Sequence, residues 1–372
     1  VPADAPEFVR EVTAQMMRGH GDDLPVSKMP IDGTYPSGTS MFEKGNVSDR
    51  VPKWEPDLCI QCGNCAFVCP HGVIRAKFYH ESSLDNAPES FPSAPVTARG
   101  FPETRYSLEV YLEDCTGCNL CVTACPAKKP DDPEVRAINM TDKAPLLEQG
   151  RKNIEFFETL AFNDRASVDF SSVRGAQFLQ PLFEFAGACA GCGETPYVKL
   201  LSQLFGPRLL VANATGCSSI YGGNLPTTPW SKNAEGSGPA WSNSLFEDNA
   251  EFGLGMRIAA DHHMTMAKQL VTELAPDIGY KLADHLVHGG QRVGSELRRQ
   301  RRRVKVLKER LQKLVETDDN PKAAALLSIV DHLIRRSIWL VGGDGWAYDI
   351  GSGGLDHVLA SGRNVNVLVM DT

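Results

Sequence analysis

Apolar residues recur at helical spacing in one segment near the start of the chain and in several segments of its second half. In residues 6–18, Phe8, Val12 and Met16 fall on one helix face, which predicts an amphipathic helix. The rest of residues 1–53 is rich in Pro, Gly, Asp and Ser, and it predicts an extended linker or a segment that wraps over a neighbouring domain. Further helices are expected near residues 153–160, 194–205, 250–274, 278–288, 294–316 and 322–335.

Short apolar runs predict three strands in the C-terminal half, at Leu209–Ala212, Ile338–Val341 and Val365–Met370. Such runs are typical of parallel strands that are buried on both faces. Because the strands alternate with helices, the pattern predicts a doubly wound α/β sheet. We assign this sheet to a domain over residues 181–372, in which residues 216–245 are expected to be irregular.

The length of 372 residues leaves room for two or three domains. A net charge of −8 argues against nucleic acid as a partner, and the lack of any run of about 20 apolar residues predicts no membrane-spanning segment. The eleven cysteines lie in tight groups, which favours metal ligation in a reducing cytoplasm over disulfide bonds. We expect no signal peptide in this form of the chain, and its end directly after an apolar run predicts a piece of a longer polypeptide.

Eight of the cysteines form two copies of one motif, Cys-x-x-Cys-x-x-Cys-x-x-x-Cys-Pro. This is the ligand spacing of ferredoxins with two 4Fe-4S clusters, in which the fourth cysteine of each run ligates the other cluster. The alternative is that the cysteines bind zinc or are unligated, but two complete runs favour the clusters. We therefore assign one cluster to Cys59, Cys62, Cys65 and Cys125, and the other to Cys115, Cys118, Cys121 and Cys69.

The paired motif defines a ferredoxin-like domain over residues 54–145. Between its halves, residues 71–111 form an insertion with many prolines and strand-like ends. Residues 146–180 are expected to be a linker that contains one helix. The chain should therefore combine an α+β cluster domain with the α/β domain that follows it.

Three further cysteines lie at glycine-rich turns. Cys189 and Cys192 are separated by two residues in a turn that opens a helix, and Cys217 follows the strand expected at 209–212. The set predicts a third metal site, while zinc, a redox-active dithiol and a chance pattern stay open as alternatives. A 4Fe-4S cluster needs four ligands, so either one iron is open or a fourth cysteine lies beyond Thr372.

The sequence Gly342-Gly343-Asp344-Gly345 lies between an expected strand and an expected helix. Glycines at such a junction let backbone N–H groups approach a phosphate, and Asp344 offers Mg²⁺ a carboxylate oxygen. A simple turn is the alternative interpretation. Because adjacent parallel strands end at the same edge of a sheet, we expect Asp344 and Thr372 to lie close together.

Three longer motifs are Cys189-Ala-Gly-Cys-Gly-Glu194, Ala214-Thr-Gly-Cys-Ser-Ser-Ile-Tyr-Gly-Gly223 and Gly343-Asp-Gly-Trp-Ala-Tyr-Asp-Ile-Gly351. In sequence and order, they resemble the pyruvate:ferredoxin (flavodoxin) oxidoreductases. The order and spacing of the two cysteine runs match that family as well, so the resemblance covers essentially the whole chain, as the C-terminal third of a large enzyme. The segment Glu43-Lys44-Gly45 resembles the family's short Glu-Lys-Arg motif, with glycine where arginine is usual.

The resemblance implies oxidative decarboxylation of pyruvate to acetyl-CoA and CO₂, with electrons passed through three 4Fe-4S clusters to ferredoxin or flavodoxin. It also implies thiamine diphosphate with Mg²⁺ in the domain that begins near residue 181. Pyruvate and coenzyme A would be bound mainly by parts outside this chain, where we also expect the catalytic residues. We further expect a cytoplasmic homo-oligomer without a nucleic-acid or membrane partner.

By motif, the resemblance also implies a role for single residues. Cys189, Cys192 and Cys217 would ligate the third cluster, with a fourth ligand from a C-terminal segment. Asp344 and Thr372 would hold Mg²⁺. The residues that would contact thiamine diphosphate are Glu194, Cys217, Gly343, Asp344, Gly345, Trp346 and Thr372.

Other functions stay open at this point. One is oxidation of another 2-oxo acid, or transfer of the electrons to a fused flavoprotein and NADP. The other, of a different class, is a non-catalytic iron–sulfur electron-transfer subunit with a vestigial α/β domain. The basic helix expected over residues 294–316 is interpreted as a solvated face, with docking of an acidic electron carrier as the alternative.

Overall fold

The computed structural model of the chain describes residues 1–223 and 226–372. The described residues form two compact units. The first comprises residues 1–207 and 216–239 together with Thr372, and the second comprises residues 208–215 and 240–371. The domain boundaries expected from the sequence stay a prediction. No helix among the described residues is long and apolar enough to cross a lipid bilayer.

In the first unit, the two cysteine runs have the same local structure. The third cysteine of each run lies on a short helix, α2 (Asn64–Val68) or α3 (Leu120–Thr123). Strands β1 (Arg50–Trp54) and β7 (Ile138–Asp142) pair antiparallel beside them. Strand β1 begins inside the segment that the sequence predicts as a linker. It was not predicted because its five residues include a proline and are too few to show a clear alternation of apolar and polar side chains.

The ends of the insertion between the two runs are strands. β2 (Ile74–His80) pairs antiparallel with β4 (Thr104–Val110), and the short β3 (Ala94–Pro95) lies on the other side of β4. A separate hairpin follows the second run. Besides short 3-10 helices, the first unit also contains β5 (Lys128–Lys129), β6 (Asp132–Arg136), the π-helical turn Val9–Thr13, α1 (Ala14–Met17), α4 (Leu147–Thr159), α5 (Val173–Ala176), α6 (Thr195–Phe205) and α7 (Cys217–Gly222).

The second unit is built on a four-stranded parallel sheet with the strand order β11-β10-β8-β9. The expected class, a ferredoxin domain followed by an α/β domain with a parallel sheet, is confirmed. Strand β9 falls in the stretch predicted to be irregular, of which residues 224–225 lie outside the described residues. Its sequence, Ala-Trp-Ser-Asn-Ser, lacks an apolar run because it is a largely exposed edge strand. The strands are β8 (Leu209–Ala214), β9 (Ala240–Ser244), β10 (Ser337–Gly343) and β11 (Asn366–Met370).

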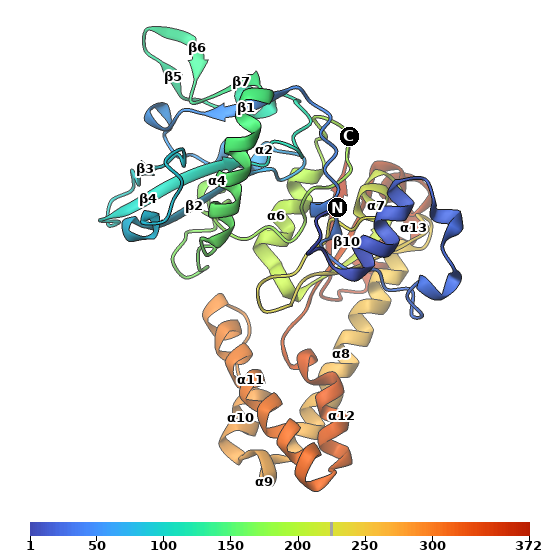
Figure 1. The fold of residues 1–372 in the computed structure, drawn as a ribbon. Coiled ribbons are helices and arrows are strands. Elements are labelled where there is room, and N and C mark those ends of the chain that lie inside the picture. Colours follow the sequence, from blue (N-terminus) through green and yellow to red (C-terminus); the bar gives the residue numbers. More distant parts are fainter. Residues whose placement is uncertain (224–225) are drawn as a thin grey trace. The chain divides into compact units, whose positions relative to one another are not determined.

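Helix α8 (Asn249–Glu273) connects this sheet to a group of helices. Gly253 lets its first half pack closely on the sheet, since a Cβ there would lie 2.5 Å from the side chain of Leu340. The second half of α8 contributes Ala267 and Val271 to a separate apolar core with the helices that follow (Figure 1). The other helices of the unit are α9 (Ala275–Ile278), α10 (Tyr280–His288), α11 (Gly294–Asp318), α12 (Pro321–Ile329), the 3-10 helix Val330–Leu333, the turn Gly345–Ile350 and α13 (Ser352–Ala360).

A buried carboxyl group on β4 makes the stability of the first unit depend on pH. Glu109 is 6% exposed, and burial raises the pKa of its side chain to about 8. The folded state therefore binds one proton more than the unfolded state between the ordinary glutamate pKa and about 8. The stabilisation from the bound proton is complete below the pKa that Glu109 has in the unfolded chain. It is lost as the pH rises through the pKa that Glu109 has in the folded protein.

We therefore expect the free energy of unfolding of Glu109→Gln to fall less steeply between pH 5 and 8 than that of the native protein. Binding of one proton limits the slope from this group to about 1.4 kcal/mol per pH unit. The measurement is the urea midpoint of the first unit's unfolding at several pH values. Glu155→Gln, on the exposed face of α4, is the matched control and should keep the native pH dependence. Equal slopes for the native protein and Glu109→Gln would contradict this account.

Candidate metal centres

Eight cysteines surround two cavities in the first unit. Each cavity is lined by four of them, and the open space between the side chains, which continues into solvent, is about 330 Å³ in one and about 320 Å³ in the other. This grouping is the one that an exchange of the fourth cysteine between the runs predicts. The first cavity is lined by Cys59, Cys62, Cys65 and Cys125, and the second by Cys69, Cys115, Cys118 and Cys121.

Left-handed backbone turns bring the thiols of each run to the same side. The residue before the second cysteine has a positive φ in both runs, +57° at Gln61 and +70° at Gly117. The backbone N–H of each donates to the first sulfur of its own run, at 3.3 Å to Cys59 Sγ and 3.4 Å to Cys115 Sγ. The same two donors would remain available to a cluster-bound thiolate, since charged acceptors strengthen such bonds.

Two thiols in each cavity are hard to ionise without a bound cation. Burial and, after it, the negative charge of neighbouring thiolates raise the pKa of Cys115 to about 11 and that of Cys121 to about 12. Burial likewise raises the pKa of Cys59 and Cys65 in the first cavity. Thiolates clustered in this way need positive charge at their centre, which iron would supply.

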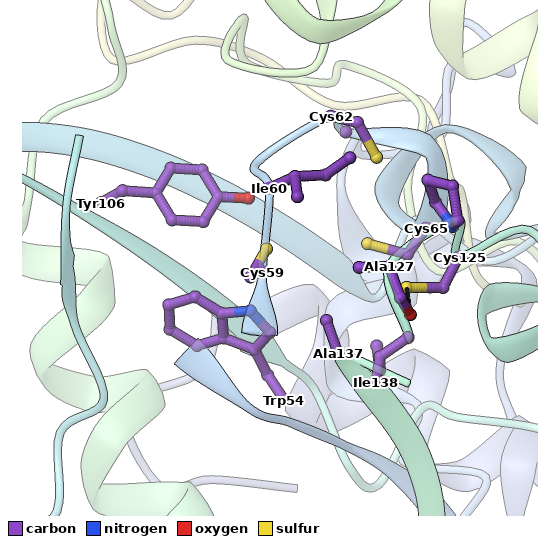
Figure 2. Close-up of a pocket in the computed structure, with 12 residues that line it drawn as sticks. Trp54, Cys59, Ile60, Cys62, Cys65, Tyr106, Cys125, Ala127, Ala137 and Ile138 are labelled. Atoms are coloured by element: carbon purple, nitrogen blue, oxygen red, sulfur yellow. Dashed lines mark hydrogen bonds between the residues drawn. The ribbon is translucent and has the colours of Figure 1, made fainter. Parts of the chain in front are cut away.

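The walls of the cavities hold buried polar groups. In the wall of the second cavity, His71 Nε2 and Thr116 Oγ1 are buried without a hydrogen-bond partner among residues 1–223 and 226–372. In the wall of the first, a hydrogen bond from Trp54 lowers the pKa of Cys59 against the larger effect of burial. Figure 2 shows the indole nitrogen of Trp54 on the ring edge that faces Cys59, with the other thiols of the set around the same space. The Trp54 N–H and the Thr116 hydroxyl can donate to the sulfur atoms of a cluster, so these residues fit 4Fe-4S groups. His71 instead donates through Nδ1 to the carbonyl of Ala186, and burial lowers its pKa, so Nε2 of the neutral ring is an acceptor.

The spacing of the thiols also bears on the zinc alternative. Within the part of the chain that the structure describes, no three His, Cys, Asp or Glu side chains are close enough to hold a single metal ion. The two sets of four instead stand around open cavities. A zinc ion needs four ligands within about 2.3 Å of one point, whereas the four ligands of a four-iron cube surround a larger space.

The third cysteine set belongs to the first unit as well. Gly191, between Cys189 and Cys192, has φ +79° at the position that Gln61 and Gly117 hold in the two runs. The turn packs on the second cavity, since a Cβ at Gly191 would lie 3.9 Å from the Cβ of Cys118. This Cys-x-x-Cys turn therefore has the backbone form of the other two and lies next to one of their thiols.

Cys217 begins helix α7, and one turn later Tyr221 points to a buried carboxylate. Tyr221 donates to Glu194 Oε2 at 2.9 Å, and Thr372 Oγ1 donates to Glu194 Oε1 at 3.3 Å. Burial raises the pKa of Tyr221, and negative charge on Glu194, Cys192 and Cys217 adds to the rise. The first unit thus brings Glu194 and Thr372 together beside two cysteines of the third set. The sequence analysis assigned no role to Tyr221. The signal that could have identified it is its position four residues after Cys217, which places both residues on the same face of the helix.

Of the residues expected to bind the diphosphate and Mg²⁺, Gly343, Asp344, Gly345 and Trp346 lie at the end of β10 in the second unit, whereas Thr372 belongs to the first. Asp344 is exposed and directly precedes the helical turn Gly345–Ile350, and no side chain fills the space beside Gly345. Trp346 is 3% exposed, and its Nε1 has no partner among the residues that the structure covers. An exposed carboxylate at a helix start is compatible with Mg²⁺ and phosphate. The expected proximity of Asp344 and Thr372 stays a prediction, because the two residues belong to different units.

Comparison with known proteins identifies two sequence families in the chain. Residues 58–129 match a 4Fe-4S dicluster domain, and residues 1–48 match EKR, a domain of unknown function. The first match agrees with the cysteine motif and supports iron–sulfur clusters in this segment. The second covers the segment in which the sequence resembles a Glu-Lys-Arg motif.

Whole-length similarity to larger proteins supports the resemblance found in the sequence. The chain is 53% identical over 370 residues to the pyruvate-flavodoxin oxidoreductase of a Nostoc species and 50% identical over 374 residues to that of Rhodospirillum rubrum. It is 44% identical over 377 residues to the pyruvate:ferredoxin oxidoreductase of Moorella thermoacetica. Each alignment covers at least 99% of this chain and 31% of the relative, so the chain spans about a third of the length of these relatives.

Proposed function

We propose that this chain is the electron-carrying part of a pyruvate:flavodoxin (ferredoxin) oxidoreductase, which oxidises pyruvate to acetyl-CoA and CO₂. The observation that carries the proposal is the series of three thiol sets within one unit. The turn of Cys189 and Cys192 packs on Cys118, and helix α2 links Cys65 of the first cavity to Cys69 of the second. We infer three 4Fe-4S clusters in that order.

Each of the first two clusters is proposed to be held by the four cysteines that line its cavity. Cys189, Cys192 and Cys217 supply three ligands of the third, and we infer that its fourth ligand lies outside these residues. The ligand exchange would keep the first two clusters close together, because Cys65 on α2 lines the first cavity and Cys69, directly after α2, lines the second. Short steps between clusters favour rapid electron transfer toward an external carrier, for which we propose flavodoxin or ferredoxin.

Thiamine diphosphate with Mg²⁺ supplies, when bound, the electron sink that makes decarboxylation of a 2-oxo acid possible. We propose Asp344 and Thr372 as ligands of Mg²⁺, with Gly343, Gly345 and Trp346 at the diphosphate. Glu194 accepts two hydrogen bonds and is 8% exposed, so it is held in one position. We propose that this fixed, buried carboxylate lines the thiamine diphosphate site.

The reaction is expected in the cytoplasm, where reducing conditions keep the thiols available, and in a homo-oligomer. Pyruvate and coenzyme A are expected to contact mainly parts of the polypeptide beyond these residues. The test uses the complete polypeptide under anaerobic conditions, with reduction of flavodoxin followed by absorbance. Turnover should require pyruvate and coenzyme A together.

The 372-residue chain expressed alone should bind iron and sulfide without oxidising pyruvate. Pyruvate turnover by the isolated chain would refute the division of roles proposed here. In the complete polypeptide, a higher kcat/KM for another 2-oxo acid would assign a different substrate. Absence of turnover with every 2-oxo acid, in protein that holds its clusters, would instead favour a non-catalytic electron-transfer subunit.

A further inference from the structure

A lysine in the first unit is buried with its charge unpaired. Lys199, on helix α6, is 3% exposed, and its ammonium donates to the backbone carbonyl of Ala66. None of the ion pairs found among residues 1–223 and 226–372 includes it. Because an ammonium has three donors and a full charge, one carbonyl satisfies it poorly. Burial of a charge without a counter-charge is costly, so the folded protein should offer a negative partner at this place.

The position of Lys199 indicates what this partner is. Ala66 belongs to helix α2, which has a thiol of the first cavity, Cys65, and one of the second, Cys69, near its two ends. The aliphatic part of the Lys199 side chain also lies against Gly72, three residues after Cys69. Burial lowers the pKa of Lys199 to about 8; negative charge on Cys69 and Cys65 opposes that shift, and the positive charge of Arg75 adds to it. The ammonium thus lies beside one proposed ligand of each cluster.

A 4Fe-4S cube with four thiolates carries net negative charge, and reduction adds one more electron to it. We propose that Lys199 is the shared counter-charge of both ferredoxin-type clusters and raises the reduction potential of each. The inference rests on the proposed function, because it requires both clusters. It adds a positioning residue for electron transfer, on the same helix that follows the third thiol set.

A second buried lysine shows that burial alone does not lead to this role. Lys77 is fully buried, and it donates to the carbonyls of Phe157 and Leu160 at the end of helix α4. Helix C-terminal carbonyls carry partial negative charge, which accounts for the ammonium there. The charged side chains that influence it are Glu158 and Arg75, and no cysteine is among them. Lys77 is therefore a matched control for the loss of a buried positive charge in the same unit.

The test is an anaerobic redox titration of the cluster-loaded protein, followed by electron paramagnetic resonance. Lys199→Met should make one-electron reduction of both clusters less favourable by about tenfold or more, which corresponds to about 59 mV for each tenfold step. Lys77→Met should leave both potentials at their native values. Cys62→Ser and Cys118→Ser, each in one cavity, assign the two signals. Unchanged potentials in Lys199→Met with full iron content, or a shift of one cluster only, would overturn the proposal.

Two further variants cover the case in which Lys199→Met does not hold iron. Lys199→Arg keeps the charge, whereas Lys199→Gln keeps polarity without it. Both potentials should be higher in Lys199→Arg than in Lys199→Gln, and equal values would overturn the proposal. Iron and sulfide analysis of the native protein distinguishes a failure of the Lys199 proposal from a failure of the proposed function. If the native protein lacked the two clusters, the proposed function itself would fail.

Discussion

Replacement of Cys125 by alanine is expected to remove the cluster of the first cavity, although Cys125 belongs to the second cysteine run. Cys125 lines the cavity of Cys59, Cys62 and Cys65, and its thiol influences the pKa of Cys59. With one of four ligands lost, that cube should be lost or degraded, so the chain should hold about four fewer irons. The second cavity keeps its four thiols and should keep its cluster.

The measurement is iron and sulfide analysis together with electron paramagnetic resonance of the reduced protein. The remaining signal in Cys125→Ala should match that of Cys62→Ala and differ from that of Cys118→Ala. Cys69→Ala provides the reciprocal control, because Cys69 belongs to the first run and lines the second cavity. A Cys125→Ala spectrum that matches Cys118→Ala would mean that each run holds its own cluster, and the exchange would be wrong.

Asp344→Ala is expected to abolish Mg²⁺-dependent binding of thiamine diphosphate to the complete polypeptide. Its carboxylate is exposed at the end of β10, next to two glycines. Loss of a partner outside the first ligand shell typically weakens metal binding 10–100-fold, so loss of a carboxylate ligand should cost about 100-fold or more. Pyruvate turnover should fall with the cofactor, while the clusters should remain.

Isothermal titration with thiamine diphosphate and Mg²⁺ measures this loss directly. Asp356→Ala removes another exposed carboxylate, on α13 of the same unit, and should bind the cofactor as the native protein does. An unchanged dissociation constant in Asp344→Ala would show that Asp344 is not a metal ligand. Iron content serves as the folding control, since the cysteines lie outside the unit that contains Asp344.

The sequence predicted the cluster domain well because its information is local. The spacing of eight cysteines, with a proline after each run, limits the loop shapes that the backbone can adopt. The left-handed turn at Gly117 could be expected from glycine, whereas Gln61 takes the same conformation without that signal. Its side chain is instead held by Pro95 and Thr97 of the insertion, which are distant in sequence. Such a contact cannot be predicted from the run alone.

Other features depend on tertiary contacts that the periodicity does not encode. Strand β9 is mostly polar, so it was predicted as irregular, yet it pairs with β8 along five positions. Lys199 shares its face of α6 with Thr195, Ser202 and Gln203, a polar pattern typical of an exposed face, yet these residues are buried and Lys199 contacts Ala66 of α2. Tyr221 and Glu194 are 27 residues apart, and only the fold brings them into hydrogen-bond contact. The sequence therefore predicted residues that belong to a local motif, but not contacts between residues that are distant in sequence.

The most direct test of the account is whether pyruvate reduces these clusters. The complete polypeptide, with thiamine diphosphate, Mg²⁺ and no external carrier, is mixed with pyruvate and frozen within milliseconds for electron paramagnetic resonance. The account predicts reduced 4Fe-4S signals, of which one is lost in Cys62→Ala and another in Cys118→Ala. Clusters that dithionite reduces but pyruvate leaves oxidised would contradict it.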